Sequence, residues 1–136
     1  MNHELVDFVA MLLVGVLFVG SGSFAIYIGR RMKNDQLPPN GMIGTRTLYA
    51  LESEENWYRV QRASAVPNIR LGYACITAGI IIMVGTFAEH FYGKHEVSDS
   101  LVFLSVLILA IAIIWFWVRY FRVKRSFEPG QGENRR

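Results

Sequence analysis

Apolar and polar positions are strongly segregated along this chain of 136 residues. Three segments contain no Asp, Glu, Lys or Arg: 8–29, 71–88 and 100–118. About 20 helical residues cross the hydrocarbon core of a bilayer, and the two shorter segments reach that length with flanking residues. None of them has the polar stripe that a helix in a small soluble domain presents to water. The pattern predicts an all-α membrane protein with three transmembrane helices, at about 6–29, 67–91 and 99–121, in one module of residues 1–125.

Composition agrees with a membrane protein. The chain is 52% hydrophobic and 18% charged, whereas roughly a quarter of the residues in soluble proteins are charged. The first segment has an acidic start, with Glu4 and Asp7, and a long apolar core, unlike a cleaved secretory signal. We therefore expect a retained helix. The single cysteine, Cys75, lies inside the second segment, where we expect it to serve as a packing residue.

The basic residues indicate an orientation. Of the 14 Lys and Arg residues, all except Lys94 lie between the first and second helices or after the third. By the positive-inside rule, we expect the amino terminus outside, with loop 30–66 and the tail 126–136 in the cytoplasm. The tail is rich in polar residues, Pro and Gly, which predicts disorder. Its basic start favours contact with anionic lipid.

The third apolar segment ends in aromatic residues interleaved with arginines. Trp and Tyr are enriched at membrane interfaces, and long basic side chains extend from there to the headgroups. We expect Arg70, one turn into the second helix, to do the same. The belt at the end of the third helix consists of Trp115, Trp117, Arg119, Tyr120, Phe121 and Arg122.

Small residues recur every four positions in two of the segments. Such a spacing lets helix backbones approach closely in lipid. Packing within one subunit and a dimer interface both fit this pattern. The residues are Ser21, Ala25 and Gly29 in the first segment, and Ala74 with Ala78 and Cys75 with Gly79 in the second.

Loop 30–66 is the longest polar segment, and we expect it to be folded. Pro38 and Pro39 end the first helix, while Gly41 and Gly44 permit a tight turn. A short helix is predicted to start at Ser53, a good N-cap. The second transmembrane helix is predicted to start at Pro67.

The short helix has two distinct faces. Glu55, Arg59 and Arg62 fall on one face. Trp57, Val60 and Ser64 fall on the other. We expect Arg46 to pair with Glu54 or Glu55. We also expect Trp57 to anchor the loop at the membrane surface or against helix ends. A solvated mixed-charge helix with no special role is the alternative.

The loop carries the pattern N-x3-G-x-R-T-x3-L-x-S-E-E-x-W-x4-R over residues 40–62. This pattern resembles the signature of the SdpI family of bacterial membrane proteins. The chain departs from it at Ala50, Gln61 and Ala63, where members often have Thr, His and Gly. The resemblance is to the carboxy-terminal module of the founding member. Arg59 is not part of the pattern, but it lies on the same helical face as Glu55 and Arg62. The predicted motif and partner-binding residues are Asn40, Gly44, Arg46, Thr47, Glu54, Glu55, Trp57, Arg59 and Arg62.

The resemblance implies an immunity or signalling protein in a bacterial plasma membrane, because the founding member protects against a secreted peptide toxin and sequesters a repressor. The expected partner is a cytoplasmic protein or a membrane-active peptide toxin. An accessory subunit of a larger membrane complex is the alternative function. A small oligomeric channel or transporter is a further alternative, although the spans lack the ionisable residues that mark ion pathways.

The sequence shows no pattern typical of a catalytic or metal-binding site. No phosphate-binding glycine loop and no nucleophile beside a base is apparent. His3, His90 and His95 lie near carboxylates but lack the spacing of a zinc site. We therefore expect neither an enzyme nor a cofactor, metal or nucleic-acid partner.

Overall fold

The computed structural model describes residues 3–93 and 95–127. Its helices are α1 (His3–Lys33), α2 (Leu48–Glu52), α3 (Glu54–Tyr92) and α4 (His95–Phe127). Three of them, α1, α3 and α4, are long and apolar enough to cross a membrane. The predicted all-α membrane fold with three spans is confirmed, and a short helix, α2, lies between the first two spans.

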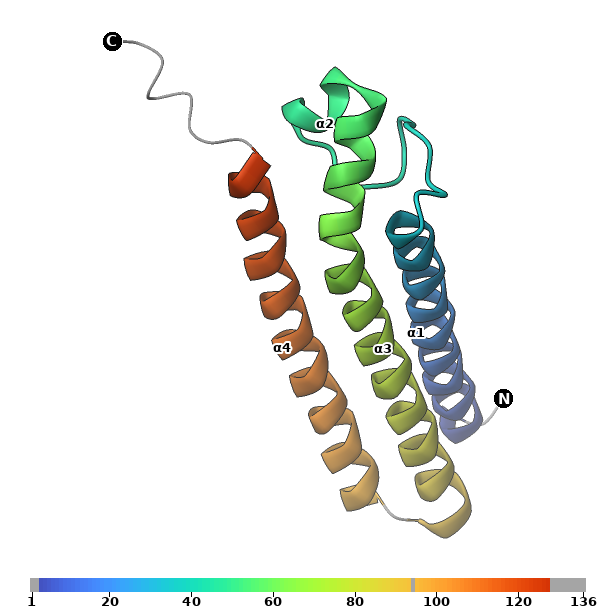
Figure 1. The fold of residues 1–136 in the computed structure, drawn as a ribbon. Helices are drawn as coiled ribbons and strands as arrows, with labels where there is room; N and C mark the ends of the chain where they lie inside the picture. The colour runs from blue at the N-terminus through green and yellow to red at the C-terminus, as the bar shows by residue number, and fades with distance from the viewer. Residues whose placement is uncertain (1–2, 94, 128–136) are drawn as a thin grey trace.

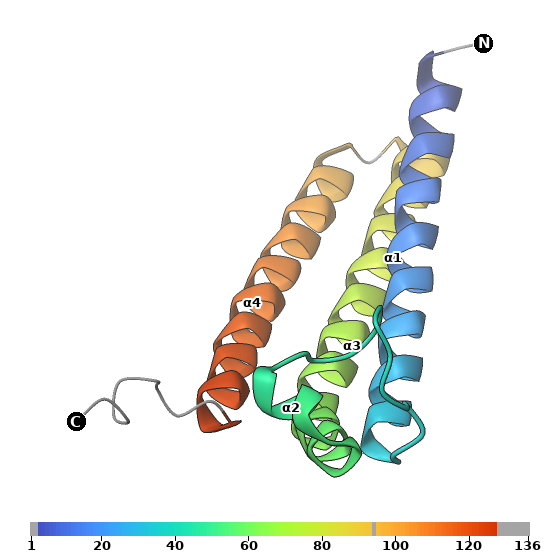
Figure 2. The ribbon, with the colours of Figure 1, turned by 90° about the horizontal axis from the view of Figure 1, so that it is seen from above.

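Helix α3 is the centre of the arrangement. Helices α1 and α4 pack against opposite sides of α3, and each runs antiparallel to it (Figure 1). The end of α1, the start of α3 and the end of α4 lie together, and we refer to this as the loop end of the bundle. Helix α2 lies there as well, beside the start of α3 (Figure 2). The loop and the end of α4 are therefore on the same side, as the distribution of basic residues predicts.

Helices α1 and α3 meet along a seam of small residues. A Cβ atom placed on Gly22 would lie 2.5 Å from the carbonyl oxygen of Gly72, and one on Gly79 would lie 2.7 Å from that of Gly15. The two backbones are therefore in direct contact, and close packing of this kind drives helix association in lipid. Gly29 continues the seam against Ala65 and Ile69.

The spacing of this seam differs from the predicted one. Gly15, Gly22 and Gly29 recur every seven residues, whereas Ser21, on the predicted four-residue stripe, is exposed. Seven residues are close to two full turns, so this period keeps one face against a long antiparallel neighbour. A four-residue spacing drifts around the helix and loses the contact after a few turns.

Helix α4 packs on the other side of α3 through small residues. Ser98 and Ser105 are buried, and Leu101 lies against Gly85. The Ser105 hydroxyl donates to the carbonyl of Leu101 at 2.8 Å, within its own helix. Most large apolar side chains of α4 point away from the bundle and are exposed.

Helix α3 begins where the sequence predicts, but it does not stop before Pro67. Ser53 is its N-cap and accepts a hydrogen bond from Asn56 N at 3.1 Å. The prediction that a separate helix starts at Pro67 is wrong, because the helix continues through this residue to Tyr92. Proline removes one helical hydrogen bond, but Pro67 is buried in packing that outweighs this loss. The adjacent Asn68 side chain donates to the Ser64 carbonyl at 2.9 Å.

Helix α4 is longer than predicted at its end. It includes Ser126 and Phe127, which the sequence predicts to belong to the tail. The remainder of the predicted disordered tail, residues 128–136, lies outside the described residues.

Gly22 and Gly20 provide a matched test of the seam. A Cβ atom on Gly20 would have no neighbouring atom within 4 Å, in contrast to Gly22. We predict that Gly22→Ala lowers the free energy of unfolding by about 1–3 kcal/mol, because the backbones must separate. Gly20→Ala should stay within about 1 kcal/mol of the wild type. Thermal unfolding in mild detergent measures both changes, and equal melting temperatures for the two variants would contradict the seam.

Candidate functional site: the polar cap at the loop end

Residues 34–62 form a folded unit at the loop end, which we call the cap. Near its start, Asp35 adopts a left-handed backbone conformation with a φ of 56°, which ends α1. Gln36 N donates to the Arg31 carbonyl at 2.9 Å, and the Arg31 guanidinium donates to the Gln36 carbonyl at 2.6 and 3.0 Å. Leu37 then enters the core beside Met32. The chain is therefore fixed from the last turn of α1 onward.

Asn40 and Gly44 shape the turn that follows. The Asn40 carboxamide oxygen accepts from Met42 N at 3.0 Å and from Ile43 N at 2.7 Å. Asparagine commonly stabilises turns in this manner. Gly44 has a φ of 118°, and a Cβ atom there would lie 2.7 Å from Gln61 Oε1. Both the backbone conformation and the close contact require glycine at this position.

Two fully buried side chains of α3 bind the backbone of the loop. The Trp57 indole Nε1 donates to the Leu37 carbonyl at 2.8 Å. The Gln61 side chain accepts from Thr45 N and donates to the Thr45 carbonyl, both at 2.9 Å. Trp57 and Gln61 are four residues apart on one face of α3. One turn of this helix therefore provides hydrogen-bond partners for the loop backbone at both Leu37 and Thr45.

Gln61 is not among the residues that the sequence pattern predicts to be functional, and it departs from the family pattern. The available signal was its position four residues after Trp57, on the apolar face of the helix. A polar residue on such a face is usually buried with its hydrogen bonds satisfied.

Thr47 caps the short helix α2. Its hydroxyl accepts from Ala50 N at 3.0 Å, and its side chain is buried. Helix α2 then packs Ala50 against Trp57 and Val60. Phe127, the last residue of α4, stacks on Tyr49 with the ring centres 5.4 Å apart. The cap is thereby connected to α4 as well as to α3.

Arg46 does not have the predicted partner. Its guanidinium donates to the Gly41 carbonyl at 2.9 Å and closes the turn between them. Glu55 instead pairs with Arg59 at 3.1 Å, one turn along α3. The prediction that Arg46 ties the loop to Glu54 or Glu55 is therefore wrong. Arg46 reaches the Gly41 carbonyl within the same turn of the loop. Glu55 and Arg59 are four residues apart in α3, a spacing that favours pairing with each other.

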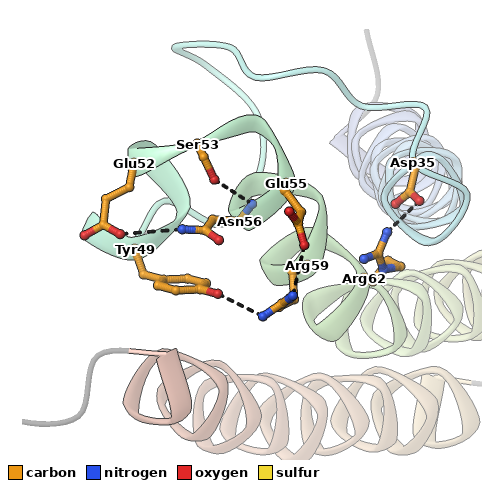
Figure 3. Close-up of polar contacts among 8 residues, drawn as sticks. All are labelled: Asp35, Tyr49, Glu52, Ser53, Glu55, Asn56, Arg59 and Arg62. Carbon is orange, nitrogen blue, oxygen red and sulfur yellow. Dashed lines mark hydrogen bonds and ion pairs between the residues drawn. The ribbon is translucent and has the colours of Figure 1, made fainter.

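Figure 3 shows Arg59 directed toward Tyr49 of α2, and Arg62 directed toward Asp35 at the end of α1. Arg59 donates to Glu55 and to the Tyr49 hydroxyl, each at 3.1 Å. Arg62 pairs with Asp35 at 2.6 Å and links α3 to the end of α1. About half of each arginine side chain is exposed, so each pair contributes at most about 1 kcal/mol. These guanidinium groups remain accessible to a partner.

Glu54 has a different role from its neighbour Glu55. Its carboxylate lies near the phenol of Tyr58, which lies before the apolar segment of α3. Partial burial of the phenol, followed by the charge of Glu54, raises the pKa of Tyr58 above its usual value.

The predicted motif residues thus form an inner group and an outer group. The inner group uses its polar atoms to fold the cap, and the outer group directs charge toward the surroundings. The inner residues are Asn40, Gly44, Arg46, Thr47 and Trp57, and the outer residues are Glu54, Glu55, Arg59 and Arg62.

The opposite end of the bundle holds the histidines. His90 stacks on Phe8 with the ring centres 4.1 Å apart, and His95 Nδ1 lies 2.8 Å from a Glu89 oxygen. Both contacts link neighbouring helices at that end. The described residues contain no cluster of three or more metal-ligating side chains.

Replacing Trp57 tests the indole hydrogen bond. We predict that Trp57→Phe destabilises the protein by about 1–3 kcal/mol, because the buried Leu37 carbonyl loses its partner. Proteolysis between residues 37 and 46 should also become faster. Trp117→Phe is the matched control, since Trp117 is half exposed on α4. Unfolding in detergent and limited proteolysis measure the effects, and similar behaviour of both variants would contradict this assignment.

Substitutions at Gln61 and at Arg46 should differ strongly in their effect on the stability of the protein. Gln61→Leu leaves the buried N–H and carbonyl of Thr45 unpaired, so we predict a loss of about 2–4 kcal/mol. Arg46→Lys retains an exposed donor near Gly41 and should change stability by less than about 0.5 kcal/mol. Chemical unfolding followed by tryptophan fluorescence measures both changes. A larger loss for Arg46→Lys than for Gln61→Leu would contradict these two assignments.

A comparison with known protein families supports the resemblance that the motif indicates. A model of the SdpI/YfhL protein family matches residues 36–118, which is more than half of the chain. The match begins just after α1 and covers most of the cap, all of α3 and much of α4. Comparisons with curated proteins and with solved structures gave no significant match. With three membrane-spanning helices and a cap built from the motif residues, this chain belongs to the SdpI/YfhL family of membrane proteins.

Proposed function

We propose that this protein is an immunity or signalling protein of a bacterial plasma membrane, which binds a partner through the outer face of its cap. In this proposal the amino terminus is outside and the cap is cytoplasmic, as the basic residues indicate. The partner is a cytoplasmic protein in signalling. In immunity, the bundle intercepts a membrane-active peptide and the cap transmits or completes that binding.

One observation supports a binding role above the others. The inner motif residues are used in folding the cap, while Glu55, Arg59 and Arg62 hold accessible charges on one helical face. A rigid surface with fixed charges provides specificity for a complementary partner. The proposed role is therefore recognition rather than catalysis.

An accessory subunit of a larger membrane complex is the second candidate. The exposed apolar face of α4 favours it, since α4 buries little of its surface against α3. In a bilayer such a face is covered either by lipid or by a neighbouring subunit. This candidate predicts that other membrane proteins co-purify with the chain in stoichiometric amounts in mild detergent. Purification of the protein as a single protomer without partners would refute it.

A charge-swap variant tests the first proposal. Glu55→Arg combined with Arg59→Glu keeps an ion pair within α3 but exchanges the two charges on the surface. We predict that cells lacking the protein become sensitive to a membrane-active peptide toxin. The wild type should restore resistance, whereas the charge swap should not, although its melting temperature should stay within a few degrees.

Glu96→Arg, at the opposite end of the bundle, is the control and should restore resistance fully. Full protection by the charge-swap variant would show that this face is not used. No change in sensitivity across a panel of such toxins after deletion would refute the immunity role. Affinity purification of wild type and charge swap from native membranes then tests the signalling role, which predicts a cytoplasmic partner with the wild type only.

A further inference from the structure

A pocket lies between α3 and α4, toward the loop end of the membrane-spanning region. Its volume is about 360 Å³, at the lower end of the roughly 300–1,000 Å³ typical of small-molecule sites. Ala74 and Ala112, with only methyl side chains, contribute to the space between the helices. Its lining consists of Arg70, Leu71, Ala74, Ile108, Ile111, Ala112 and Trp115.

The polar group in this lining is at one end. Arg70 is the lining residue of α3 nearest the loop end, and Trp115 is the corresponding residue of α4. The rest of the lining is aliphatic. An elongated molecule with an apolar chain and a polar group at the membrane interface therefore matches the order of residues along the pocket.

Two arginines converge on Trp115. The guanidinium carbon of Arg70 lies 5.1 Å from the Trp115 ring centre, and that of Arg119 lies 5.4 Å from it. The indole attracts each cation through its π face, but a ring cannot neutralise two charges. Both arginines thus place positive charge around Trp115, at the loop-side edge of the pocket.

Carboxylates are absent from the helix segments around this site. Residues 63–88 and 100–127 contain no Asp or Glu. The ion pairs within the described part of the chain involve neither Arg70 nor Arg119. The two guanidinium groups therefore form an anion-attracting site next to an apolar pocket.

From this arrangement we infer that the pocket binds one anionic phospholipid of the leaflet on the loop side. The lipid phosphate lies at Arg70 and Arg119, where guanidinium donors match phosphate oxygens. One acyl chain occupies the space beside Ala74 and Ala112. Basic pockets between transmembrane helices bind anionic headgroups in this way. The inference is independent of any partner of the cap.

Native mass spectrometry of the full-length protein in mild detergent tests the headgroup site. The probes are phosphatidylglycerol and phosphatidylcholine with the same acyl chains. We expect one phosphatidylglycerol per protein, bound more tightly than phosphatidylcholine. Arg70→Gln and Arg119→Gln should each weaken binding about fivefold. Arg122→Gln, on the same helix end with the same change in charge, should have a much smaller effect.

Filling the pocket tests the acyl-chain site separately. Ala112→Leu adds bulk within the lining, whereas Ala110→Leu adds the same bulk on the exposed side of α4. We expect Ala112→Leu to lose the bound phosphatidylglycerol and Ala110→Leu to retain it. Equal affinity for the two lipids, or equal weakening by the three arginine variants, would overturn the inference. Retention of the lipid by Ala112→Leu would also overturn it.

Discussion

The hydrogen-bonding demand of the loop backbone is the constraint on which the cap depends. The chain between α1 and α2 is pressed against the end of an apolar bundle, where buried peptide groups need partners within the protein. Trp57 and Gln61 supply these partners from a single turn of α3, at the Leu37 carbonyl and at both polar groups of Thr45. Because both side chains are fully buried, the loop is held by bonds that water does not weaken.

The seam between α1 and α3 determines whether these bonds can form. Gly22 and Gly72 bring the two backbones into contact, which fixes the end of α1 relative to α3. Leu37 follows closely after α1, so its carbonyl is placed within reach of Trp57. The packing inside the membrane and the cap outside it are consequently one continuous structure.

The sequence was sufficient for the fold because charge-free segments of this length have few alternatives. It also located Ser53 as a helix start, since a capping side chain acts on its immediate neighbours. It failed at Pro67, because the cost of a proline depends on packing across the helix. It did not identify the partner of Arg46, because sequence spacing does not show that the Gly41 carbonyl lies closer to this guanidinium than the Glu55 carboxylate does. The short helix α2 depends on Thr47 and on the burial of Ala50, which are visible only in the folded cap.

The sequence predicted which residues belong to the candidate site, but it did not predict what each of them does. All nine motif residues lie in or next to the cap, yet five of them act in its folding and four direct polar groups outward. Periodicity along α3 separated Trp57 from Arg59 correctly. It could not show which backbone groups a buried side chain satisfies, because those belong to a distant part of the chain.

Hydrogen exchange at the Thr45 amide tests this account most directly. The amide donates to the buried Gln61 side chain, so in the wild-type protein in detergent micelles it should exchange as slowly as amides within α3. Exchange at the rate of an unstructured peptide, while the amides of α3 stay protected, would contradict the account.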